Sequence, residues 1–334
     1  MSGLRYRPGC VADVPNALQL LQAERVPLGP RLWSGLPELL PELLKREMVK
    51  AYVIEEGDAG RLRWFGLSAF LTPEVLRLGL LEMETPFRRF LLQAALDNAQ
   101  PFLSQRQIAS SNAASDLNLT VLLCQPDVGE YTQEQGGLLF RMAYDSFCFA
   151  HAGFGLASFW QEVADHKRAE VLEGLGLVLH RRMVTEKGPD HFLLNYTRER
   201  AQANPGQAMS FVFNGLAPRF GFSTAQQQLL ESALLDVSDR DFAIAHRVTD
   251  DAVKKRWRAV YDRVSAVEPS MATAEQGGAN QRRVLLGYLR QHLEELRPYH
   301  QDNHHGQAPR SIPSTNSDQI SLSPFNPNQI RLQN

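Results

Sequence analysis

The pattern of apolar residues changes near residue 200, and this change constrains the fold more than any other feature of the sequence. Before it, strand-like runs alternate with helical segments. The runs 51–56 and 61–71, for example, flank the turn-forming residues 57–60 and predict a hairpin. After it, the apolar spacing is helical as far as about Tyr299. The sequence therefore predicts an α+β protein, in which a mixed α/β domain precedes an all-α domain.

Two segments of low apolar content define the expected domain limits. Small residues, prolines and glycines at 201–220 predict a linker, and the end of the chain is rich in Asn, Gln, Ser, Pro and His. We expect a mixed α/β domain at 1–200, a linker at 201–220, a four-helix domain at 221–299 and a disordered tail at 300–334. Within the first domain, further strands are expected at 4–8, 117–126, 156–164, 178–186 and 191–199, and helices at 11–24, 36–48, 138–154 and 166–176.

Charge and cysteine content limit the classes of partner. The 334 residues carry a formal net charge of −2, so a nucleic acid would have to bind to a local basic patch. The three cysteines, Cys10, Cys124 and Cys148, are far apart and lack the spacing of metal ligands, which predicts no disulfide and no metal site. No run approaches the roughly 20 apolar residues that span a bilayer. We therefore expect a cytoplasmic protein without a membrane partner.

A cationic helix is expected at 251–264. Stepping it at about 100° per residue places four apolar side chains on one buried face and most of the cations on the other side or its flank. The apolar face holds Val253, Trp257, Val260 and Val264, and the cations are Lys254, Lys255, Arg256, Arg258 and Arg263. Such a helix is commonly only a solvated surface. Here, however, it follows two shorter predicted helices, with a tight connection at 248–250, and this order is typical of a helix-turn-helix.

Two segments in one ungapped register resemble the LuxR-type helix-turn-helix domain. Residues 238–243 are similar to that family's Ser-Asn-x-Glu-Ile-Ala, and residues 248–256 to its Ile-Ser-x-x-Thr-Val-Lys-x-His. The resemblance implies a bacterial-type transcriptional regulator that reads the major groove of double-stranded DNA with helix 251–264. It implies DNA contacts by Thr249, Lys254, Lys255, Arg256 and Arg258. A homodimer and a contact with RNA polymerase are the other implied partners, and the leucines of the helix at 281–298 form either a dimer contact or part of the core.

The first domain resembles the GNAT acetyltransferase fold in the order of its expected strands and helices. The nearest local likeness is at 166–182, which is similar to the family's Leu-Tyr-Glu-x-Leu-Gly-Phe helix end and the strand that follows it. The resemblance implies an acyl-coenzyme A ligand, with Gly136 and Gly137 as candidate residues of the pyrophosphate turn. Two departures argue against catalysis: Leu138 replaces a small residue of that turn, and Leu172 stands where the family has a proton-donating tyrosine.

These departures favour a GNAT-like domain that is not an enzyme and that senses a ligand or holds a dimer together. No catalytic residue and no resident cofactor are predicted. Asp145, Ser146 and His151 crowd one apolar helix and are expected in the core or on the surface, and the adjacent Glu55 and Glu56 point to opposite faces of a strand. Two other functions remain open: an active N-acetyltransferase with an appended helical targeting domain, and a helical module that binds another protein.

Overall fold

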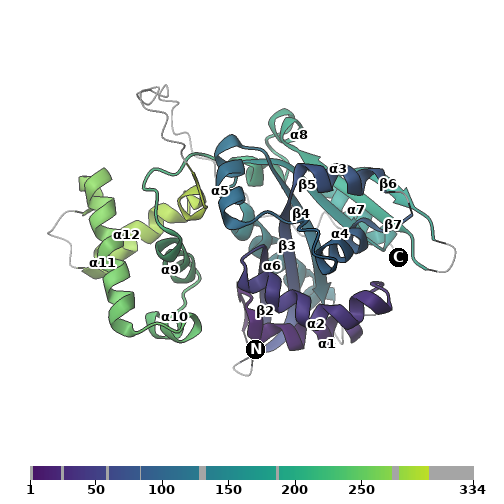
Figure 1. Ribbon diagram of the computed structural model, residues 1–334. Coiled ribbons are helices and arrows are strands. Elements are labelled where there is room, and N and C mark those ends of the chain that lie inside the picture. Colours follow the sequence, from purple (N-terminus) through teal and green to yellow (C-terminus); the bar gives the residue numbers. More distant parts are fainter. Residues whose placement is uncertain are drawn as a thin grey trace.

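The computed structural model divides the chain into a sheet unit and a helical unit that lie side by side (Figure 1). It describes residues 3–23, 26–57, 60–82, 84–127, 133–185, 188–272 and 278–300. The disordered tail predicted at 300–334 lies outside the described residues apart from His300. Within the described ranges, no helix combines the length and the apolar character that a membrane span requires.

One mixed sheet organises the first 200 residues. Its strands follow the order β1-β2-β3-β4-β5-β7-β6. β4 and β5 pair in parallel, whereas the other neighbouring strands pair antiparallel. The strands are β1 (Leu4–Pro8), β2 (Val49–Glu56), β3 (Arg61–Leu71), β4 (Leu117–Pro126), β5 (Leu156–Val163), β6 (Val178–Met183) and β7 (His191–Thr197).

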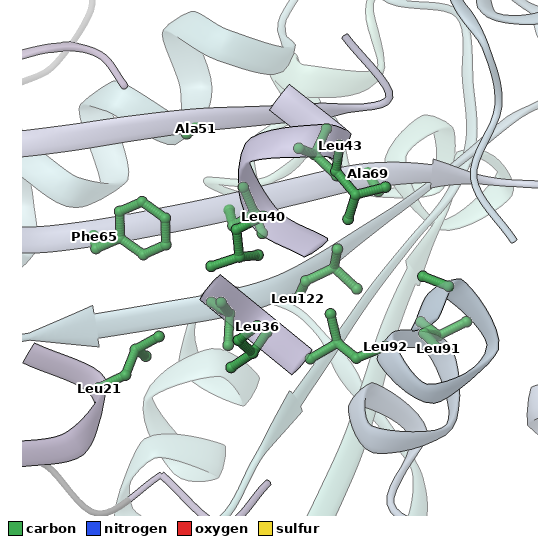
Figure 2. Packing of buried hydrophobic residues seen from close by; sticks show 14 of the residues in the cluster. Leu21, Leu36, Leu40, Leu43, Ala51, Phe65, Ala69, Leu91, Leu92 and Leu122 are labelled. Atoms are coloured by element: carbon green, nitrogen blue, oxygen red, sulfur yellow. The ribbon is translucent and has the colours of Figure 1, made fainter. Parts of the chain in front are cut away.

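Helices cover both faces of this sheet. Those of the sheet unit are α1 (Val14–Ala23), α2 (Pro30–Lys45), α3 (Pro73–Leu81), α4 (Phe87–Leu96), α5 (Gln105–Ala114), α6 (Gln133–His151), α7 (His166–Gly174) and α8 (Arg198–Ala203), with 3-10 turns η1 (Val11–Asp13) and η2 (Ser210–Phe213). On one face, leucines of α1, α2 and α4 pack on β2, β3 and β4 (Figure 2). On the other face, α6 and α7 pack on the sheet and leave room for the site described below.

The predicted mixed α/β sheet with helices is confirmed. The sequence predicts a linker at 201–220, but Met209, Val212 and Phe213 within it are buried in the core beneath β5 and β7. The first part of that segment therefore belongs to the sheet unit. Helices α3, α4 and α5, between β3 and β4, have no counterpart among the expected elements.

The helical unit is built around the apolar face of one long helix. Its elements are α9 (Thr224–Leu234), α10 (Asp239–His246), α11 (Asp250–Val267) and α12 (Gly278–Leu289), with 3-10 turns η3 (Pro269–Ala272) and η4 (Leu293–Leu296). Val253, Trp257, Val260 and Val264 of α11 are buried as their spacing predicts. The leucines of the last predicted helix at 281–298 complete this core, with Leu285, Leu289 and Leu296 nearly inaccessible.

A buried guanidinium joins the two units. Arg297, which follows η4, is fully buried, and its Nε donates to the carbonyl oxygen of Ala152 at 2.8 Å. Its second terminal nitrogen donates to the carbonyl oxygen of Phe149, so the cation lies at the carboxyl end of α6, where a positive charge is favourable. Glu231 of α9 completes the junction, because its carboxylate accepts a 2.7 Å hydrogen bond from the hydroxyl of Tyr52 on β2.

The close approach of the two units at Gly153 yields a test of this junction. Gly153 has φ +86°, and a Cβ there would lie 2.4 Å from the backbone nitrogen of Glu294. We expect Gly153→Ala to lower the free energy of unfolding by about 3 kcal/mol, because it combines backbone strain with a backbone clash. Gly174→Ala is the control, since a Cβ at that position meets nothing within 4 Å. Urea denaturation should show a lower midpoint for the first variant, and equal midpoints would contradict the junction.

Candidate active site

The two parallel strands diverge in the middle of the sheet. Pairing of β4 with β5 ends at Val121 and Gln161, although β4 continues to Pro126 and β5 to Val163. A bulge lies at the same point, because β3 pairs Leu67 with Leu123 and Ser68 with Val121, leaving Leu122 without a partner. Leu122 points into the leucine core of the opposite face (Figure 2). Bulges are frequent next to active sites, where they redirect side chains.

A row of paired residues crosses the sheet at the point of divergence. Lys50 of β2 is the partner of Ser68, Ser68 that of Val121, and Val121 that of Gln161. All four residues line one cavity of about 100 Å³ between the sheet and helices α6 and α7. Aromatic and aliphatic side chains form most of the remaining wall, including Phe140, Phe147, Phe159, Leu172, Leu175 and Leu177. The site is thus an apolar cavity with a few polar groups, which is typical of a binding pocket for a small molecule.

The carboxyl ends of β4 and β5 lie beside the cavity. In open α/β sheets, ligands bind in the crevice outside such strand ends, where helix amino termini favour anions. Helix α6 follows β4, and α7 follows β5. Burial raises the pKa of the Cys124 thiol to about 11, although the positive charges of Arg168 and Arg88 act to lower it. The charges of two guanidinium groups therefore act on a thiol near the carboxyl end of β4.

Ser68 and His151 form a buried hydrogen-bonded pair in the cavity wall. Oγ of Ser68 lies 2.7 Å from Nε2 of His151, and Nδ1 of His151 lies 2.7 Å from the carbonyl oxygen of Phe147. Because a carbonyl oxygen only accepts, Nδ1 carries the proton, and Nε2 accepts from the serine hydroxyl. Burial lowers the pKa of His151 to about 3, so the imidazole is neutral at ordinary pH.

The structure separates the three polar residues that the sequence placed together on one apolar helix. Asp145 is exposed, whereas Ser146 and His151 are buried. Ser146 donates to the carbonyl oxygen of Ala143 at 2.8 Å, within its own helix. The residue that sequence analysis missed is Ser68, which lies 83 positions from His151 and has no local motif around it.

The cavity is lined by a tyrosine of α6, whereas the sequence resemblance points to a position on α7. Leu172 lines the cavity and has no proton to donate. Tyr144 of α6 lines the same cavity and donates a 2.6 Å hydrogen bond to the carbonyl oxygen of Ala208. Burial raises the pKa of Tyr144 well above its usual value, with Cys148 and Asp145 adding to the effect. Tyr144 is therefore suited to donate hydrogen bonds rather than to release its proton.

The helical unit supplies charge at one side of the cavity. Nζ of Lys50 lies 3.9 Å from a carboxylate oxygen of Glu231, and Arg297 is 3.7 Å from the same oxygen. Burial lowers the pKa of Lys50 to about 8, against the opposing charge of Glu231, and the charge of Arg297 adds to the lowering. The site thus includes an amine that is only partly protonated in mildly alkaline solution, beside a carboxylate from the other unit.

The residues predicted to contact DNA occupy three different environments. Lys254, Lys255 and Arg258 are exposed on α11, and Lys254 lies 3.6 Å from Asp251. Thr249 caps the helix, with its side-chain oxygen accepting from the backbone nitrogen of Ala252.

Arg256 turns back toward α10. Its guanidinium lies 5.7 Å from the centre of the Phe242 ring, and one of its terminal nitrogens is buried without a hydrogen-bond partner among the described residues. This cation is therefore directed at the helical core rather than at solvent.

The two glycines proposed for a pyrophosphate turn lie in the first turns of α6, not in a loop. A Cβ at Gly136 or Gly137 would meet nothing within 4 Å, so packing does not require glycine there. Among the residues that the structure describes, no cluster of His, Cys, Asp or Glu is suited to hold a metal ion.

Several solved acetyltransferase structures are similar to this chain. A polyamine N-acetyltransferase from Drosophila melanogaster is 13% identical, with a TM-score of 0.34, and the match covers 58% of this chain and 100% of that one. NAA60 from Arabidopsis thaliana, in complex with acetyl-CoA, is 9% identical over 58% of this chain and 99% of its own, with a TM-score of 0.36. An aminoglycoside N(6')-acetyltransferase from Legionella pneumophila is 9% identical over 61% of this chain and 97% of its own, with a TM-score of 0.36. No protein-family model and no curated protein sequence matches the chain.

The prediction of a non-catalytic, DNA-binding transcriptional regulator is wrong. The solved structures named above are acetyltransferases, and these likenesses provide no support for a LuxR-type domain. The physical reason lies in the cavity. The domain was taken as inactive because Leu172 has no proton to donate, but the fold brings Ser68, Tyr144 and His151 to the same cavity from β3 and α6. The prediction that the chain is not an enzyme is wrong for the same reason.

The buried imidazole yields a prediction for acid stability. Between pH 6.5 and about 3, the unfolded chain binds a proton at His151 that the folded chain does not. The free energy of unfolding should therefore decrease as the pH is lowered through this window, by up to about 1.4 kcal/mol per pH unit from this group. His151→Gln should give a shallower pH dependence than the wild-type chain when urea unfolding is measured at several pH values. Parallel curves for the two proteins would contradict the neutral, buried state of His151.

Proposed function

We propose that this chain is an acyltransferase that takes its acyl group from a coenzyme A thioester and passes it to an acceptor in the cavity. The observation that carries the proposal is the divergence of β4 and β5 beyond Val121 and Gln161, at a bulge and beside an apolar cavity. This arrangement offers a narrow apolar path that ends at polar groups. An acyl thioester on a long flexible arm has the matching shape and polarity.

The strand edge supplies the expected contacts for the arm of the donor. Beyond Val121, β4 no longer pairs with β5, so backbone groups on that edge are available to an extended ligand. An arm with amide groups can pair there as a short added strand. The row from Lys50 to Gln161 then marks where the thioester would meet the polar groups of the cavity.

The charges near the strand ends suit the phosphates of the donor. Arg88 and Arg168 both act on the thiol of Cys124 at the end of β4. Burial lowers the pKa of Arg88, and the charge of Glu162 opposes this effect. A phosphate group within reach of these cations would form charge-assisted hydrogen bonds. Glu134 in the first turn of α6 is exposed and would have to turn away from such a group.

The helical unit has a structural part in this proposal. Glu231 and Arg297 hold it against the end of β2 and the carboxyl end of α6, beside the cavity. An appended unit in this position adds charged groups to one wall. It thereby contributes to the choice of acceptor, since Lys50 and Tyr52 both line the cavity and both contact Glu231.

A cavity-filling substitution tests the proposal. Ala143 of α6 is buried and lines the cavity, so Ala143→Phe should block the donor and weaken acetyl-coenzyme A binding at least about tenfold, or about 1.4 kcal/mol. Leu138→Phe is the matched control, because Leu138 is 51% exposed on the same helix. Isothermal titration calorimetry with the full chain measures both affinities, and thermal unfolding checks that each variant is folded.

Two outcomes would count against the proposal. If the wild-type chain shows no heat of binding with acetyl-coenzyme A, the chain does not use this donor. If both variants bind as tightly as the wild-type chain, the donor binds elsewhere. Binding that is weakened in Ala143→Phe alone supports the crevice and the cavity as the donor site.

A further inference from the structure

Ser68 has the surroundings of a nucleophile. It lies at the β4 bulge, its hydroxyl donates to a neutral imidazole at 2.7 Å, and its side chain lines the cavity. The imidazole is held in one tautomer by the carbonyl oxygen of Phe147. A serine hydroxyl that donates to an oriented base is the arrangement that activates a weak nucleophile.

Lys50 places a cation beside the same serine. It is the cross-strand partner of Ser68, and its positive charge lowers the pKa of His151, so it disfavours a proton on that imidazole. A tetrahedral intermediate formed at Ser68 would carry a negative oxygen, which a nearby cation stabilises in an apolar site. Lys50 is held beside the cavity by the carboxylate of Glu231, at 3.9 Å from Nζ.

A second buried serine in the same cavity differs in the features that matter. Ser146 is as inaccessible as Ser68, but its hydroxyl donates to the carbonyl oxygen of Ala143 and has no base beside it. A carbonyl oxygen cannot remove a proton from a hydroxyl under these conditions. The two serines therefore form a matched pair, one with a base and one without.

We propose that Ser68 is a covalent acyl carrier, so that transfer passes through an ester on its side chain. The identity of the natural donor rests on the proposed function, whereas the reactivity of Ser68 does not. In the first step, Oγ of Ser68 attacks the acyl carbon, and its proton moves to Nε2 of His151. The bond from the acyl carbon to sulfur breaks, and the thiolate takes the proton from His151. In the second step, an amine or hydroxyl acceptor attacks the ester carbon and gives a proton to His151. The bond to Oγ then breaks, and Oγ regains that proton.

A small activated ester tests this step without coenzyme A. The full chain is treated with p-nitrophenyl acetate, release of p-nitrophenolate is followed by absorbance, and the acetylated residue is located by peptide mass spectrometry. We expect a burst of about one equivalent per chain and an acetyl group on Ser68. Ser68→Ala should abolish the burst, and His151→Gln should slow it at least about 100-fold. Ser34→Ala should leave it unchanged, because Ser34 lies on α2 and is not among the residues that line the cavity.

A second variant keeps the test decisive if Ser68→Ala is poorly folded. Ser68→Cys preserves the size of the side chain beside the imidazole, and its acetyl adduct at position 68 should be a thioester that neutral hydroxylamine removes. An adduct on Ser146 or Lys50, or no adduct on any variant, would overturn the inference.

The two proposals can fail separately. Acetylation of Ser68 without binding of acetyl-coenzyme A would uphold the acyl carrier and reject the donor. Tight binding and transfer from acetyl-coenzyme A that persist in Ser68→Ala would uphold the donor and reject the carrier, since transfer would then be direct.

Discussion

The site depends on a single constraint, the parting of β4 and β5 after Val121 and Gln161. Backbone groups in a sheet interior are normally paired, and a strand edge opened inside a sheet needs another partner. The bulge at Leu122 turns that side chain to the opposite core while β5 keeps its partner β7 through Val163. The sheet thus stays continuous on both sides of an opening, and the cavity, the helix amino termini and the paired row of residues are arranged around it.

The carboxyl end of α6 links the cavity to the helical unit. Arg297 donates to the carbonyl oxygens of Phe149 and Ala152, on either side of His151 in the chain. Docking of the helical unit therefore holds the helix end that carries the imidazole. A fully buried guanidinium is costly unless paired, and Glu231 supplies the charge from α9. The two units consequently share one set of buried charges, and the second unit contributes to the geometry of the first.

The helical unit also shows why a pattern of helices does not establish a function. The apolar stripe of α11, its N-cap region and the short connection before it are consistent with their spacing in the sequence. These features specify how helices pack, and packing of this kind serves many functions. The cationic surface is reduced by Asp251 beside Lys254 and by the inward turn of Arg256 onto Phe242. A helical wheel distinguishes the two sides of a helix but not the direction in which a long side chain folds.

Sequence alone determined the hairpin of β2 and β3 and the buried face of α11, because local periodicity sets which side of an element is apolar. It did not reveal helices α3 to α5, the burial of Met209 and Val212, or the cavity. Tertiary structure decided the meeting of Ser68 with His151, since residues 83 positions apart are joined by strand register and helix packing. The position of the bulge set that register, and no short stretch of sequence carries it.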